Sequence, residues 1–197
     1  MKKKIIIGLL AAIMAVSATA CSTSGSSSSQ SSQKTGTVEA TVKATEEETT
    51  EEPTGSESSA IKPGNYVEHD NLKFSFQYAK TYDEIKQSDY YSDKAGDGKE
   101  FLVLFFEVQN VSEEDEYLNM FYFEAYVDDY DVDMKTLLAD PDGYSLLSGD
   151  IAKGKKMKGC VAYEVDKGWK KFELTYTDGI LNNSPSYDFV VTPDDLK

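Results

Sequence analysis

The sequence predicts an all-β fold for residues 61–197, and three observations support this prediction. Apolar and aromatic residues occur in short runs that alternate with polar residues, which is the period of a strand with one buried face. Turn residues, mainly Gly, Asp and Asn, separate these runs. Only two segments, 80–92 and 140–149, have a composition that allows a short helical turn.

The first predicted strands lie at 72–79 and 100–111. In LKFSFQYA (72–79), one Leu, two Phe and one Tyr alternate with polar residues, so we expect a half-buried strand. The segment EFLVLFFEVQNV (100–111) is apolar on both faces. It is therefore expected to be a central strand that is covered on both sides.

Later segments complete a set of seven to eight strands. The segments 117–127 and 131–138 flank the turn DDYD, and 156–165 alternates again. The last two predicted strands are 170–177 and 187–192. Strands of this length and spacing are typical of an immunoglobulin-like β-sandwich.

The first 20 residues have the layout of a secretory signal peptide. Three lysines (2–4) precede a twelve-residue apolar run (5–16), and small residues follow (17–20). The apolar run is too short to span a bilayer permanently. We therefore expect residues 1–20 to direct export and to be removed.

Cys21 follows the small residues directly, and two processing events fit this position. The sequence ATA before Cys21 satisfies the small-x-small pattern of an ordinary signal peptidase site. The same site resembles the lipobox of bacterial lipoproteins, except that Ala18 stands where lipoboxes usually carry Leu. The resemblance implies that Cys21 carries a diacylglycerol thioether with palmitate-type chains. Two or more acyl chains hold a protein stably on a membrane.

Residues 21–60 are predicted to be a disordered linker behind this lipidated N-terminus. The segment is rich in Ser, Thr and Glu, and residues 22–59 contain no aromatic residue. Such a composition cannot bury enough apolar surface to offset the entropy lost on ordering. The predicted organisation is therefore a signal peptide (1–20), a linker (21–60) and one folded domain (61–197).

The folded region resembles a domain of unknown function found in Gram-positive lipoproteins. The resemblance rests on a Gly-x-Glu-aromatic strand start (98–101), an Asn-x-Ser turn (110–112), a turn at Gly154, and a glycine-containing strand that ends in Tyr-Glu-Val (159–165). It covers roughly residues 64–192. The family is similar to telokin-like immunoglobulin folds and to secreted immunoprotective antigens of mycobacteria. This implies a fold and an envelope location, but no established chemistry.

The charge distribution excludes one class of partner. The formal net charge is −15, and all 20 basic residues are lysines. An acidic surface repels the phosphate backbone, and the chain lacks arginine, the residue best suited to bidentate phosphate contacts. We therefore expect no nucleic-acid binding.

The residues available for catalysis are few. His69 is the only histidine, and Cys160 is the only thiol besides Cys21. A Cys–His dyad would need the two side chains to meet, together with a third group that orients the imidazole. Cys160 lies within a predicted strand, where a small thiol packs as an apolar side chain. No catalysis is expected, and Trp169, in a turn, is expected to cover one end of the core.

Acidic residues between 128 and 142 form a candidate cation site. The carboxylates concerned are Asp128, Asp129, Asp131, Asp140 and Asp142. Counted from Asp129, the spacing is similar to that of a calcium-binding loop, but Met134 occupies the position where the sharp turn requires Gly. Two interpretations remain: a looser Ca²⁺ site at an exposed edge, or acids that face solvent without a ligand.

Tyrosines provide a candidate binding surface, because Tyr gives a large contact area with few rotatable bonds. The residues selected are Tyr117, Tyr122, Tyr126, Tyr130 and Tyr144. The sequence thus favours a lipid-anchored, non-enzymatic binding module on the extracellular face of the cytoplasmic membrane. Its expected partner is a protein or an envelope component. The alternative is a lipoprotein that binds Ca²⁺ or a small ligand through residues 128–142.

Overall fold

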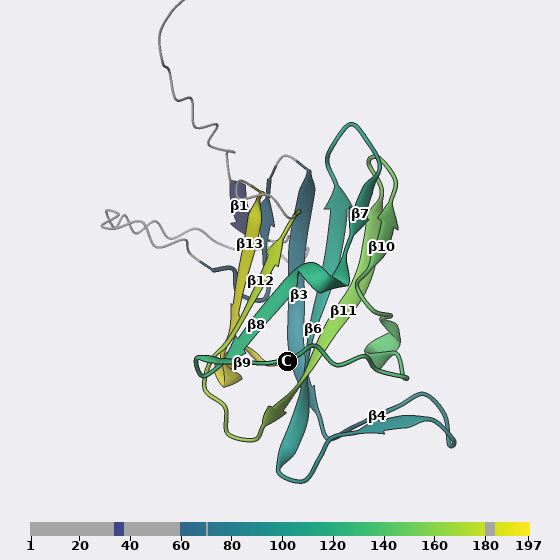
Figure 1. The fold of residues 1–197 in the computed structure, drawn as a ribbon, viewed down its shortest axis with the longest axis vertical. Coiled ribbons are helices and arrows are strands. Elements are labelled where there is room, and N and C mark those ends of the chain that lie inside the picture. Colours follow the sequence, from purple (N-terminus) through teal and green to yellow (C-terminus); the bar gives the residue numbers. More distant parts are fainter. Residues whose placement is uncertain (1–33, 38–59, 70, 180–183) are drawn as a thin grey trace, which may run out of the picture. The chain divides into compact units, whose positions relative to one another are not determined.

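The computed structural model describes residues 34–37, 60–69, 71–179 and 184–197 (Figure 1). These residues form two main antiparallel sheets and two short two-stranded ones, which confirms the all-β prediction. No helix in these ranges is long and apolar enough to cross a bilayer. The predicted signal peptide, Cys21 and most of the predicted linker lie outside the described residues.

The first sheet has the strand order β1-β2-β3-β6-β11, and the second has the order β13-β12-β8-β9. The strands of the first sheet are β1 (Lys34–Thr37), β2 (Asn65–Glu68), β3 (Leu72–Tyr82), β6 (Lys99–Asn110) and β11 (Lys156–Asp166). Those of the second are β8 (Phe123–Val127), β9 (Tyr130–Asp131), β12 (Phe172–Thr177) and β13 (Ser186–Val191). The predicted strands at 72–79, 100–111, 156–165, 170–177 and 187–192 are all present, with shifts at their ends.

The main core lies between the two sheets, so the fold is a β-sandwich. Aromatic rings from the first sheet contact rings from the second: the centroids of Phe74 and Tyr187 are 4.7 Å apart, and those of Phe106 and Phe189 are 5.0 Å apart. Trp169 is buried at the edge of this core, and its indole nitrogen donates a hydrogen bond to Glu100 (3.0 Å). This confirms its predicted role as a cover.

A second, smaller core lies on the opposite face of the first sheet. Phe101, Val103 and Phe105 of β6 point to this outer face and are buried there. Their cover comes from Ile85 and from the segment 137–147, in which Ala139 is buried. The two-sided burial predicted for this strand is therefore present, and a loop and a short hairpin supply the second cover.

The predicted strand at 117–127 is interrupted. A 3₁₀ turn, η1 (Met120–Tyr122), separates β7 (Glu116–Leu118) from β8. Strand β7 pairs with β10 (Gly149–Ile151), whereas β8 pairs with β12, so the chain changes sheets at the turn. Leu118 before the turn and Phe123 and Ala125 after it all enter the main core, so the turn shifts the alternation of buried residues, and the segment reads as apolar on both faces.

The predicted strand at 131–138 is wrong. Only β9 forms, and the chain then leaves the second sheet. The N–H of Val132 still donates to Ala125 of β8 (3.1 Å), but the N–H of Lys135 donates to Ala162 of β11 (2.7 Å). This segment is a bridge between the two sheets, so it cannot continue as a regular strand of either one.

Two further differences concern segments of low apolar content. Residues 80–92 contain the end of β3, β4 (Glu84–Lys86) and the start of β5 (Ser92–Lys94), so no helical turn forms there. A short 3₁₀ turn, η2 (Pro141–Gly143), does form within 140–149. Residues 34–37, which were predicted to belong to the disordered linker, form β1 and pair with β2.

Gly159 provides a test of how the segment around Leu147 packs against β11 on the side of the main core. A Cβ atom at this position of β11 would lie 2.7 Å from Cα of Leu147, whose N–H bonds to the carbonyl of Cys160 (2.9 Å). Because the obstacle is backbone, Gly159→Ala is expected to destabilise the domain by about 1–3 kcal/mol. The measurement is urea unfolding followed by the fluorescence of Trp169, the single tryptophan.

Gly96→Ala is the matched control for this substitution. A Cβ atom at Gly96 would meet only ordinary contacts, the nearest being the Glu164 carboxylate at 3.7 Å. The expected change is therefore within about 0.5 kcal/mol. Equal stability of the two variants would contradict the proposed packing of 145–147 against β11.

Candidate functional site

The predicted tyrosine surface is divided over several parts of the domain. Tyr130 is 77% exposed, Tyr117 57% and Tyr126 43%. Tyr126 and Tyr130 lie on neighbouring strands, β8 and β9, whereas Tyr117 lies on β7. These three tyrosines are available to a partner.

The other two predicted tyrosines are partly buried. Tyr122 packs against the main core, with its ring 6.4 Å from that of Tyr176. Tyr144 covers the outer face of the first sheet, with its ring 5.1 Å from that of Phe105. The structure therefore does not gather the five predicted tyrosines into one patch.

Among the described residues, the most exposed aromatic side chain lies on the β4–β5 hairpin, beside a second exposed tyrosine. Tyr90 is 91% exposed and Tyr91 is 63% exposed, and both belong to the five-residue connection between the strands. In Figure 1 this hairpin extends away from the two sheets. Sequence reasoning did not select this pair as a site. The available signal was two adjacent aromatics flanked by Ser and Asp, a context that is typical of a turn.

The base of this hairpin is fastened to the domain. Asp93 of β5 accepts hydrogen bonds from the N–H groups of Leu138 (2.7 Å) and Ala139 (2.9 Å). Ile85 of β4 is buried in the outer core, and Asp83 forms an ion pair with Lys167 (2.6 Å). Two exposed rings are thus carried on a hairpin with a fixed base.

A second exposed apolar place surrounds Phe121, which is 79% exposed. It borders a surface cleft of about 360 Å³ between η1 and the segment that bridges the sheets. The residues that line the cleft are Met120, Phe121, Phe123, Asp133, Met134 and Thr136. Flexible methionines beside an exposed ring are suited to contact with an apolar group.

The predicted cation ligands on the β8–β9 turn have a structural role. Asp128 and Asp129 have positive φ angles, 49° and 71°, and form the turn itself. The Asp128 carboxylate accepts hydrogen bonds from the N–H groups of Lys170 (3.0 Å) and Lys171 (2.9 Å). This carboxylate therefore caps the neighbouring chain segment before β12.

Of the remaining predicted ligands, Asp131 lies on β9, and Asp140 and Asp142 lie on the segment that covers the outer face of the first sheet. Asp140 accepts a hydrogen bond from Ser145 (3.1 Å), and Asp142 forms an ion pair with Lys80 (3.2 Å). Within the described ranges, no group of three or more His, Cys, Asp or Glu side chains lies where it could hold a metal ion. The five acids belong to different segments, and Asp128, Asp140 and Asp142 have local partners, so the structure does not bring the five together as one site.

Asp142 also affects the groups around it. Burial raises the pKa of Asp142, but hydrogen bonds from Lys80 and Tyr78 oppose this effect, and the net pKa is lowered. Burial and the Asp142 carboxylate together raise the pKa of Tyr78 to about 12. The cluster is a neutralised ion pair on the outer face, with Asp142 ionised at neutral pH.

Cys160 and His69 have separate surroundings. Cys160 is buried in the outer core, where its Sγ donates to the carbonyl of Tyr144 (3.3 Å). Burial, with a smaller contribution from Asp140, raises the pKa of its thiol to about 12. His69 is buried against the ring of Tyr187 (4.7 Å), with Nε2 2.9 Å from the carbonyl of Ser186. Cys160 therefore stays protonated and lacks the activation that a nucleophile requires.

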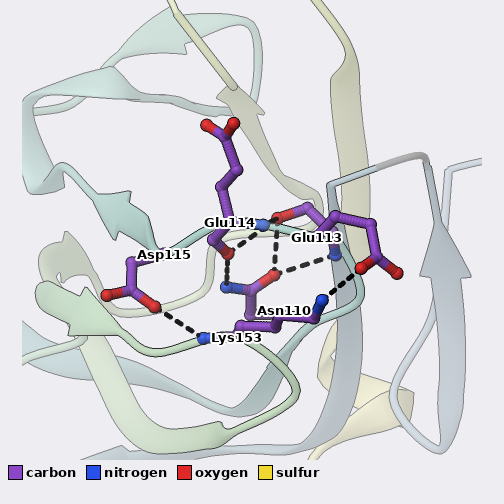
Figure 2. A network of polar contacts seen from close by, with 6 residues as sticks. Asn110, Glu113, Glu114, Asp115 and Lys153 are labelled. Carbon is purple, nitrogen blue, oxygen red and sulfur yellow. Dashed lines mark hydrogen bonds and ion pairs between the residues drawn. The ribbon is translucent and has the colours of Figure 1, made fainter.

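A buried polar network holds one end of the sandwich (Figure 2). The Asn110 side chain is fully buried at the end of β6 and donates to the carbonyls of Glu114 (2.7 Å) and Ile151 (2.8 Å). Its oxygen accepts hydrogen bonds from both the N–H and the hydroxyl of Ser112 (2.9 Å each). The Asn-x-Ser turn is therefore closed by its own side chains.

The same network connects two loops that are distant in sequence. Lys153 forms an ion pair with Glu113, and its N–H donates to the Asp115 carboxylate (2.9 Å). Together with the bond from Asn110 to Ile151, these contacts join the 110–116 turn to the turn after β10. The Asn-x-Ser motif is a structural element, and its acidic neighbours are partners of a backbone amide and a lysine.

The family model described as a domain of unknown function (DUF4352) matches residues 61–186, so the chain belongs to this family. The comparison with curated proteins gives no match.

Two solved structures from Bacillus subtilis are similar to the chain. One is a candidate lipoprotein (ycdA), with 20% identity and a TM-score of 0.50 over 64% of this chain and 38% of the other. The second is the yjhA protein, with 19% identity and a TM-score of 0.50 over 65% of this chain and 97% of the other. The chain thus spans less than half of the length of ycdA. At these identities the likeness establishes the fold.

Asn110 generates a prediction about stability. In Asn110→Ala the buried carbonyl of Ile151 loses its donor and the N–H of Ser112 loses its acceptor, and the cost of unsatisfied buried groups is about 2–3 kcal/mol. The matched control is Asn119→Ala, which removes one cap bond to the N–H of Phe121 near the surface and is expected to cost about 1 kcal/mol or less. Urea unfolding measures both. A smaller loss for Asn110→Ala than for Asn119→Ala would contradict the role of the network.

Proposed function

We propose that the protein is a lipid-anchored, non-enzymatic binding module on the outer face of the cytoplasmic membrane of a Gram-positive-type cell. The signal-peptide layout and Cys21 support the anchor. Membership of the DUF4352 family is consistent with it, because a solved structure with the same fold is described as a candidate lipoprotein.

The observation that carries the binding function is the pair of exposed tyrosines on the β4–β5 hairpin. More than half of the surface of Tyr90 and of Tyr91 is exposed to solvent. Their rings and hydroxyls make both residues effective contact groups. The fixed base of the hairpin reduces the ordering entropy that binding would cost. Such an arrangement serves recognition better than it serves stability.

The hairpin also defines the chemistry of the partner. Gln87, Ser88 and Asp89 precede the two rings and offer hydrogen-bonding groups beside them. Rings next to such groups suit a protein surface or a neutral envelope glycan. The net charge of −15 disfavours polyanionic partners.

The anchor is tested by Cys21→Ala in the host. The parent protein is expected to incorporate labelled palmitate and to sediment with membranes, because acyl chains hold it there. Cys21→Ala is expected to incorporate none and to appear in the soluble or secreted fraction. The matched control is Cys160→Ala, which removes the other thiol and is expected to keep both label and membrane association. Membrane retention and labelling of Cys21→Ala would overturn the anchor.

The contact surface is tested by Tyr90→Ala/Tyr91→Ala. Purified protein is sedimented with cell walls and, separately, with membrane vesicles from the host. The double variant is expected to bind at least about tenfold more weakly than the parent, because exposed aromatic anchors dominate contact energies. Tyr130→Ala, which removes an exposed ring from strand β9, is the control and is expected to bind like the parent. Unchanged binding of the double variant, or equal loss in the control, would contradict the assignment.

A further inference from the structure

Strand β1 is the outermost strand of the first sheet and comes from the segment between Cys21 and the domain. Its four residues pair antiparallel with β2, in a register that places Lys34 opposite Glu68 and Thr37 opposite Asn65. Within the described residues, β2 is its only strand partner. The edge of β2 therefore accepts an extended segment, and the chain itself supplies it.

The contact between the two strands is selective at Gly36. A Cβ atom at this position would lie 2.5 Å from the ring of Tyr66, which stands directly opposite. The Tyr66 ring also carries the Lys73 ammonium 3.8 Å from its centroid, which opposes its rotation away from β1. A side chain at position 36 would therefore have to push the end of the Tyr66 ring out of its contact with Lys73, so a small residue is favoured opposite Tyr66. The Lys34–Glu68 ion pair (3.5 Å) favours a basic residue at the other end.

The contacts that hold β1 on the sheet are nevertheless limited. The strand is four residues long, and Lys34 and Thr35 are exposed. An open cavity of about 270 Å³ lies beside it and is lined by Thr35, Gly36, Ala60, Ile61, Lys62, Asn65 and Tyr66. A short edge strand with an incompletely filled flank is expected to open at low free-energy cost.

Because β1 lies between Cys21 and the domain, its release from β2 would lengthen the connection between the two. Thirteen residues lead from Cys21 to Lys34, and 39 lead from Cys21 to Ala60. At no more than about 3.5 Å per residue, these segments can span at most about 45 Å and about 135 Å respectively. The pairing of β1 with β2 therefore limits the distance between residue 21 and the domain to about a third of its possible value.

The hairpin with Tyr90 and Tyr91 is at the far end of the domain from this attachment. Strand β2 pairs with the start of β3, at Lys73 to Ser75, whereas β4 follows the end of β3 after Tyr82. Figure 1 shows β1 and the β4 hairpin at opposite ends of the sheets. Any change in the length of the connection to residue 21 is therefore also a change in the reach of the tyrosine pair.

We infer that β1 is a releasable clasp: docked on the edge of β2 it holds the domain close to its anchor, and released it lets the tyrosine hairpin reach farther into the envelope. The docking site is the β2 edge with Tyr66 and Glu68, and its ligand is the segment 34–37 of the same chain. The consequence for reach rests on the proposed anchoring at Cys21, but the docking itself does not.

The docking is tested by Gly36→Val in the otherwise complete chain, with hydrogen exchange measured by mass spectrometry. In the parent, amides of 34–37 are expected to exchange at least about tenfold more slowly than unprotected amides. In Gly36→Val that protection is expected to disappear, and exchange in 65–68 to rise, while β6 and β11 remain unchanged. Gly55→Val, at another linker glycine, is the control and is expected to leave all these rates unchanged. Unprotected amides at 34–37 in the parent, or protection retained in Gly36→Val, would overturn the clasp.

A second measurement covers the case in which Gly36→Val disturbs the domain itself. A synthetic peptide of residues 31–40 is added to Gly36→Val and is expected to restore slow exchange in 65–68. The same peptide with Val in place of Gly36 is expected to restore nothing. Equal effects of the two peptides, or no effect of either, would contradict recognition of the segment by the β2 edge.

The consequence for reach is measured on vesicles with maleimide lipids, to which the chain lacking residues 1–20 is coupled through Cys21, since the other thiol is buried. Neutron reflectometry of the supported layer is expected to place the Gly36→Val domain farther from the bilayer than the parent and the Gly55→Val control. Equal distances from the bilayer for the parent and Gly36→Val domains would contradict the proposed effect of β1 release on reach. Because this anchor is artificial, the result is separate from palmitate labelling in the host, which tests the proposed function.

Discussion

Strand β6 is buried on both faces, and the rest of the domain depends on covering both. One face meets the second sheet through rings such as Phe106, which packs on Phe189. The other face, with Phe101 and Phe105, needs a separate cover, which the segment 137–147 and the base of the β4–β5 hairpin provide. A sandwich of two sheets alone would leave these rings in water. The outer cover is irregular because it must cross the strands of β11 and β6 and still satisfy its own backbone groups.

The polar residues of the domain are largely used to satisfy that irregular backbone. Asp93 and Asp128 each accept two backbone N–H groups, and Asn110 joins two loops at the end of β6. Acidic residues that are grouped in the sequence thereby lie on different segments, and Asp128, Asp140 and Asp142 are paired locally. This explains why acidic spacing between 128 and 142 is a poor guide to a cation site here. It also makes the tyrosines of the β4–β5 hairpin stand out, because no packing requirement explains their position.

Periodicity predicts the strands that pair along their whole length within one sheet, and fails where the chain changes neighbours. Strands β3, β6, β11, β12 and β13 follow from alternation or from continuous apolar character. The turn at Met120–Tyr122 does not, because two strands that pair with different sheets but bury side chains in the same core produce the same pattern as one long strand. Strand β1 has no apolar pattern that would predict it. Its pairing depends on Gly36 and on Tyr66 of β2, which lies 30 positions later in the sequence. Trp169 and Cys160 were predicted correctly as core residues because their strand and turn contexts leave them few alternatives.

The edges of the two sheets determine which contacts with other molecules are open. The edge of β11 is covered by the bridging and crossing segments, through Lys135 and Leu147. The edge of β13 is met by the parallel bridge from Ile61, and β9 is only two residues long and flanked by aspartates. Short, charged or covered edges discourage strand addition. Contact by exposed side chains is therefore favoured at the β4–β5 hairpin, whereas among the described edges of the two main sheets, backbone pairing with a further segment is favoured at the edge of β2. The chain's own linker occupies that edge, so a change there is coupled to the distance between the domain and its N-terminal segment.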